Sequence, residues 1–74
     1  MPKAYVLIRA KAGEMWKLQR AIEKIDGIKD VQVITGPYDL VAYAEVPSAN
    51  SLRLMLDRFH SLKGIISTET WMVL

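Results

Sequence analysis

Apolar residues recur along the chain in two different rhythms, and the order of these rhythms predicts the fold. Alternating runs rich in β-branched and aromatic residues are typical of strands, whereas apolar residues spaced by three and four are typical of helices. The strand-like runs cover residues 3–9, 28–35, 40–46 and 65–74, and the helical stripes cover residues 14–25 and 52–62. The predicted order is strand-helix-strand-strand-helix-strand.

Each helix is predicted from an apolar stripe and from capping residues at its ends. The first stripe consists of Met15, Leu18, Ile22 and Ile25, and the second of Leu52, Met55, Leu56, Phe59 and Leu62. Ser48 and Asn50 are candidates for the N-cap of the second helix. Gly27 and Gly64 are the expected C-caps, because glycine readily takes the left-handed conformation that ends many helices.

This order is typical of an α+β, ferredoxin-like βαββαβ fold. Right-handed crossovers place both helices on one face of a four-stranded antiparallel sheet, in the strand order 4-1-3-2. The other face carries no helix, yet residues such as Tyr43, Trp71 and Val73 are expected there. A bare apolar face of several hundred Å² marks an interaction site. We therefore expect this face to pack on a second copy of the chain.

Composition supports a single small domain that associates with itself. The chain has 74 residues, no cysteine and 51% hydrophobic residues, and its mean hydropathy is +0.13. We expect residues 1–74 to form one domain, and domains of this size are marginal alone and often gain stability by oligomerisation. The net charge is only +2 and basic residues are scattered, so no nucleic-acid stripe is predicted. No apolar run approaches the roughly 20 residues of a membrane span and no signal peptide is evident, so a cytoplasmic location is expected.

The most unusual chemistry lies in the turn between the second and third strands, at Gly36-Pro37-Tyr38-Asp39. Gly36 tolerates a positive φ, and Pro37 stiffens the turn and has no N–H to donate. A carboxylate, a phenol and free peptide groups at one rigid tip can hold a small polar ligand. The alternative is an ordinary hairpin turn in which Asp39 bonds its own backbone.

The run from Gly36 to Val41 resembles a motif of the Lrp/AsnC family, in which a strand is followed by G-x-[YF]-D and an apolar strand. The ligand-binding part of that family is the RAM domain. The step Asp26-Gly27-Ile28 and the Thr-rich stretch 64–70 also resemble the family, so the likeness covers nearly the whole chain. The first strand begins at Lys3, so the chain is similar to the stand-alone form that lacks the helix-turn-helix.

The resemblance implies a dimeric α/β barrel, formed when two sheets pack face to face. It also implies rings of four or five dimers, an octamer or decamer, with amino-acid effectors bound between dimers near the hairpin tip and the last strand. The expected function is binding of an amino-acid effector by an oligomerising module that regulates transcription or amino-acid metabolism. Direct DNA binding is not expected, but co-assembly with a full-length regulator of the family is.

An amino acid needs an acceptor for its ammonium group and donors for its carboxylate. Asp39 offers a charge-assisted acceptor, Tyr38 a wall for the ligand side chain, and hydroxyls near the start of the last strand offer donors. The predicted ligand-binding residues are Gly36, Tyr38, Asp39, Leu40, Ser67, Thr68 and Thr70. In the alternative interpretation, the threonines are ordinary strand residues and Tyr38 is a packing residue.

Two other functional classes were considered, enzymes and RNA-binding proteins. Some small dimeric α/β barrels are monooxygenases or isomerases, so the fold alone does not decide against an enzyme. The sole histidine, His60, has no catalytic or metal-ligand partner at a recognisable spacing, so no catalytic residue, metal or cofactor is expected. RNA binding through exposed aromatics would need a motif and a charge pattern that this sequence lacks.

Overall fold

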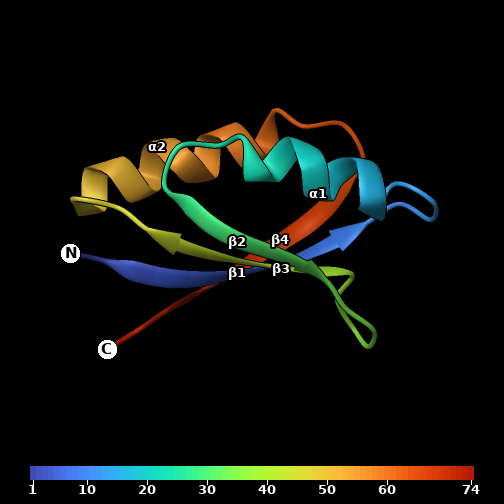
Figure 1. Cartoon of the computed structure of the whole chain (residues 1–74), viewed down its shortest axis with the longest axis horizontal. Helices are drawn as coiled ribbons and strands as arrows, with labels where there is room; N and C mark the ends of the chain where they lie inside the picture. Colours follow the sequence, from blue (N-terminus) through green and yellow to red (C-terminus); the bar gives the residue numbers. More distant parts are fainter.

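The computed structural model describes residues 1–74 as a two-layer α+β fold (Figure 1). The elements are β1 (Lys3–Ala10), α1 (Met15–Glu23), β2 (Ile28–Val33), β3 (Leu40–Glu45), α2 (Ala49–His60) and β4 (Ile65–Met72). Both helices lie on the same face of the sheet, and the opposite face carries no element (Figure 1). The predicted element order and the ferredoxin-like arrangement are confirmed.

The sheet is antiparallel throughout and has the strand order β2-β3-β1-β4, so the predicted order 4-1-3-2 is also confirmed. The two central strands, β1 and β3, pair with Tyr5 opposite Tyr43 and Val6 opposite Ala42. β4 lies on the other side of β1, with Trp71 opposite Tyr5. Residues directly opposite each other point to the same face of the sheet, so the register decides which side chains share a surface.

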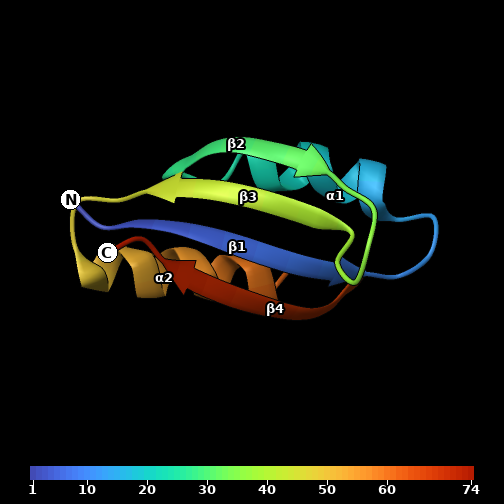
Figure 2. The ribbon, with the colours of Figure 1, turned by 90° about the horizontal axis from the view of Figure 1, so that it is seen from below.

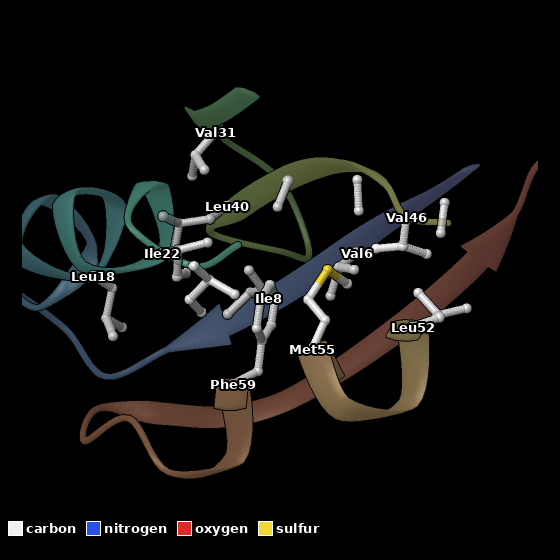
Figure 3. Close-up of a cluster of buried hydrophobic side chains, with 14 of the residues drawn as sticks. Val6, Ile8, Leu18, Ile22, Val31, Leu40, Val46, Leu52, Met55 and Phe59 are labelled. Carbon is white, nitrogen blue, oxygen red and sulfur yellow. The ribbon is translucent and has the colours of Figure 1, made fainter. Parts of the chain in front are cut away.

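The hydrophobic core fills the space between the sheet and the two helices (Figure 3). Every second residue of β1 contributes, and Val6 and Ile8 are completely buried. Phe59 reaches this core from α2 and Ile22 from α1, and both are likewise completely buried. Apolar residues spaced by two along β1 and by three and four along the helices therefore face one shared core.

The ends of several elements differ from the prediction. The first helix ends at Glu23 with Lys24 as its C-cap, so Gly27 is not a helix cap. Its φ of +96° instead allows the sharp turn into β2. Gly64 has the same role before β4, because α2 is capped by Ser61. The N-cap of α2 was predicted correctly: the Ser51 N–H donates to the Ser48 hydroxyl over 3.1 Å.

Figure 2 looks onto the face of the sheet that carries no helices. The register of the strands places several apolar and aromatic residues on this face. We call it the open face and define its apolar part by five residues from three strands. These residues are Tyr5, Leu7, Val41, Tyr43 and Trp71. The rings of Tyr5 and Tyr43 lie 5.1 Å apart between centroids, and Trp71 is 54% exposed. The single chain thus leaves aromatic surface in contact with water.

Candidate functional site

The hairpin tip between β2 and β3 lies beside the end of β1 (Figure 2). Gly36 has a φ of +119°, a conformation that glycine tolerates and other residues rarely adopt. The turn is closed by the Ile34 N–H, which donates to the Asp39 carbonyl over 2.9 Å. Asp39 in turn donates its N–H to the Ile8 carbonyl over 2.9 Å. The tip is therefore held by hydrogen bonds to β1 as well as within the hairpin.

The Asp39 carboxylate also bonds to β1. Its Oδ2 accepts the Ala10 N–H over 2.7 Å, across a separation of 29 residues. A carboxylate that accepts a backbone N–H forms a strong, charge-assisted bond. The interpretation that Asp39 bonds its own backbone is therefore wrong, because its partner is distant in sequence. The Oδ1 atom has no hydrogen-bond partner within the chain, so it can accept from a ligand.

Tyr38 connects the tip to the open face. Its hydroxyl donates to Glu69 Oε2 over 2.6 Å, and the Trp71 Nε1–H donates to the other oxygen of the same carboxylate. The hydrogen bonds from Tyr38 and then from Trp71 lower the pKa of Glu69. The bond to Glu69 raises the pKa of Tyr38, because the neutral phenol is the donor. Glu69 thus holds two aromatic rings in fixed positions at one end of the open face.

We expect the hydrogen bond between Tyr38 and Glu69 to make the free energy of unfolding fall at both low and high pH. The lowered pKa of Glu69 contributes stability that is present above its ordinary value of 4.5 and is lost as the pH falls through the folded-state value. The raised pKa of Tyr38 contributes stability that is present below 10.0 and is lost as the pH rises through its folded-state value. Both effects are small, because both side chains are in contact with water. Urea unfolding of the native chain and of Tyr38→Phe across this range measures them: parallel profiles would show that the bond contributes nothing.

The register divides the predicted hydroxyl donors between two faces. Ser67 lies opposite Arg9 on the open face, together with Glu69. Thr68 and Thr70 lie opposite Ile8 and Val6, and so point to the helix-covered face. The three hydroxyls therefore do not line one pocket, because neighbouring strand residues point in opposite directions.

Leu40 also differs from the other predicted ligand-binding residues. Its side chain is completely buried in the core, so only its backbone lies near the tip. The residues that the structure brings together at this end are Gly36, Tyr38, Asp39 and Ser67.

Two charged residues at this end of the sheet were not predicted as site residues. Glu69 accepts from Tyr38, and the positive charge of Arg9 acts on the Tyr38 phenol by lowering its pKa against the larger effect of Glu69. The sequence did contain a signal for these two residues. Arg9 on β1 and Glu69 on β4 are charged residues that alternate with the core-facing positions of their strands and so lie on the same face as Leu7 and Trp71. We include Arg9 and Glu69 in the candidate site.

The other candidate chemistry is dispersed. His60 is exposed at the end of α2. No group of three or more histidine, cysteine, aspartate or glutamate side chains is placed to hold a metal ion. Neither helix is long and apolar enough to cross a membrane.

Comparison with known proteins identifies relatives of this chain. Residues 3–74 match the family described as the Lrp/AsnC ligand binding domain. The HTH-type transcriptional regulator FL11 of Pyrococcus abyssi is 32% identical over 71 residues, which are 96% of this chain and 47% of FL11. The chain therefore spans about half the length of the curated regulators that it matches.

Two solved structures illustrate the range of similarity. TTHA0845 from Thermus thermophilus is 33% identical and superposes with a TM-score of 0.95, covering 100% of this chain and 94% of that protein. The transcriptional regulator NMB0573 from Neisseria meningitidis, solved in complex with L-methionine, is 18% identical with a TM-score of 0.81. That match covers 99% of this chain and 49% of NMB0573 and demonstrates the shared fold.

Proposed function

Because the chain belongs to the Lrp/AsnC ligand-binding domain family, we propose that it is an effector-binding module that recognises an amino acid at the β2–β3 hairpin tip. The observation that carries this proposal is the free oxygen of Asp39 beside the stiff turn at Gly36. A carboxylate that is already anchored by one backbone bond is a preorganised acceptor for an ammonium group. The L-methionine complex of NMB0573 supports the same class of ligand.

The residues around Asp39 supply the remaining parts of a zwitterion site. Arg9 provides a guanidinium that can bind a carboxylate with two parallel hydrogen bonds. Ser67 adds a hydroxyl donor opposite Arg9 on the same face. Tyr38, held by Glu69, forms a rigid wall for the ligand side chain. Gly36 has open space around its Cα, so the backbone there is accessible to a ligand.

We further propose that the open face pairs with the open face of a second chain to form a dimer. Large exposed apolar patches on small proteins mark such interfaces, and Tyr5, Tyr43 and Trp71 supply aromatic anchors of the kind that dominate binding energy. Dimers then assemble into rings of four or five. The hairpin tips lie at the contacts between dimers, where a neighbouring dimer completes the effector site.

The module would act on gene regulation through assembly. FL11 is about twice as long as this chain, and a shared ligand-binding domain would allow mixed assemblies with such a regulator in the cytoplasm. Effector binding would then change the composition or geometry of the mixed ring. This part of the proposal is tested by mixing the purified chain with a regulator of the family and measuring the mass of the assemblies.

A thermal-unfolding scan against the twenty amino acids tests ligand binding. An effector at about a hundred times its dissociation constant stabilises the folded state by about 2.7 kcal/mol, which corresponds to a rise in melting temperature of about 10 °C or more for a domain of this size. We expect Asp39→Asn to lose most of this rise. The amide oxygen still accepts the Ala10 N–H, but the charge that binds the ammonium group is gone.

Asp39→Ala is the matched comparison. This change also leaves the Ala10 N–H without its acceptor, so it is expected to cost about 1–3 kcal/mol of stability in addition. An unchanged thermal shift in Asp39→Asn would remove Asp39 from the site. A scan in which no amino acid stabilises the native chain would contradict the proposed effector class.

A further inference from the structure

An open hollow lies at the end of the sheet opposite to the hairpin tip. It has a volume of about 380 Å³ and lies between α2, the turn after α1 and the end of β3. This volume falls within the range of about 300–1,000 Å³ that is common for small-molecule sites. Its lining includes Asp26, Lys29, Val46, Leu54, Met55 and Arg58. None of them belongs to the effector site proposed above.

The hollow lies beside the turn that follows α1, and Gly27 is one of its lining residues. α1 ends at Glu23, so the corner where β2 begins and β3 ends is left without a covering helix. A Cβ on Gly27 would lie 2.8 Å from Val46 Cγ1 and 3.6 Å from Met55 Sδ. Val46 and Met55 are each 3% exposed, so they form a packed apolar floor.

The rim of the hollow carries charges of both signs. The acidic lining residues are Asp26, in the turn after α1, and Glu45, at the end of β3. Lys29 and Arg58 supply cations from β2 and α2. Asp26, Lys29 and Arg58 are all exposed. Leu54 adds an apolar wall that is 54% exposed.

We propose that this hollow is a second ligand site that binds a small zwitterion with an apolar side chain, of the α-amino acid class. Arg58 and Lys29 bind the carboxylate and Asp26 binds the ammonium group, in charge-assisted hydrogen bonds. The side chain of the ligand packs on Met55 and Leu54. The helix layer carries this hollow, so it stays accessible when the open face is covered by a second chain.

Methyl NMR on the full chain tests this site directly and works in large assemblies. Each of the twenty amino acids is titrated to millimolar concentration while the methyl groups of Val46 and Met55 report on the hollow and that of Ile34 reports on the hairpin tip. We expect one or more apolar amino acids to give saturable shifts of Val46 and Met55. Arg58→Met, which keeps an unbranched stem, is expected to weaken this binding at least about tenfold.

Arg53→Met is the matched control, because Arg53 lies on the same helix but bonds to Asn50 and does not line the hollow. This variant should bind as the native chain does. The desamino analogue of the bound amino acid should bind at least about tenfold more weakly, because it cannot bond to Asp26. Equal binding of the analogue would overturn the assignment of a zwitterion.

The same titration separates this proposal from the effector site at the tip. Shifts confined to Ile34 would overturn the second site and leave the proposed function standing. Shifts confined to Val46 and Met55 would support the second site and count against the tip. The absence of any saturable shift at Val46 and Met55 with all twenty amino acids would refute the hollow as an amino-acid site.

Discussion

Replacing Val41 by lysine is expected to convert the proposed dimer into monomers while each chain keeps its fold. Val41 lies on the open face, opposite Leu7 on one side and Gln32 on the other. In the single chain a lysine at this position extends its ammonium group into water. In the proposed dimer both ammonium groups would be buried without a partner, at a cost of several kcal/mol each. A total above about 4 kcal/mol raises the dimer dissociation constant at least about 1,000-fold.

Sedimentation equilibrium at micromolar concentration measures this change. The matched control is Trp16→Lys, which introduces the same charge at an exposed aromatic residue of α1, on the other side of the molecule from the open face. That variant should keep the mass of the native assembly. If Val41→Lys remains dimeric, the two sheets do not pack through the open face, and the proposed barrel arrangement is wrong.

Gly27→Ala is expected to destabilise the chain by about 2–5 kcal/mol. The first cause is the backbone, since a residue with a side chain at a φ of +96° is strained by about 1–2 kcal/mol. The second cause is overpacking, because the new Cβ would lie 2.8 Å from Val46 Cγ1, and forced shifts in a packed core cost about 1–3 kcal/mol. For a chain of 74 residues this is a large part of the total stability.

Gly13→Ala separates the two causes. Gly13 has a similar φ of +83°, but a Cβ there would meet no atom within 4 Å. Its substitution should therefore cost only the backbone strain of about 1–2 kcal/mol. Urea unfolding of both variants gives the difference, and equal losses of stability would show that the contact with Val46 is harmless.

Local patterns were sufficient for the elements and for the layers. The alternation along β1 predicted which residues enter the core, and Val6 and Ile8 are indeed completely buried. The spacing of apolar residues in α2 predicted that Phe59 would face the sheet, where it is buried. These predictions succeed because a strand and a helix each have one fixed period, so a pattern of residues translates directly into a face.

One part of the predicted site, its group of hydroxyl donors, depends on which face of β4 each side chain occupies. Ser67 and Thr68 are neighbours in sequence and were assigned to one pocket, but they point to opposite faces of β4. The ends of α1 and α2 were also placed too late, because the glycines at 27 and 64 form turns into strands rather than helix caps. Glycine tolerates a positive φ in either setting, so the sequence alone does not distinguish them.

The sequence by itself determined the order of the elements, the two faces of the sheet, the stiff turn at Gly36 and the likeness to a known ligand-binding family. Only the tertiary structure decided that Asp39 bonds to Ala10, that Tyr38 bonds to Glu69 and that a hollow opens beside Gly27. The first group depends on periods and backbone preferences within a few residues. The second depends on the register of strands that are distant in sequence and on where a helix stops, and these are settled only when the whole core packs.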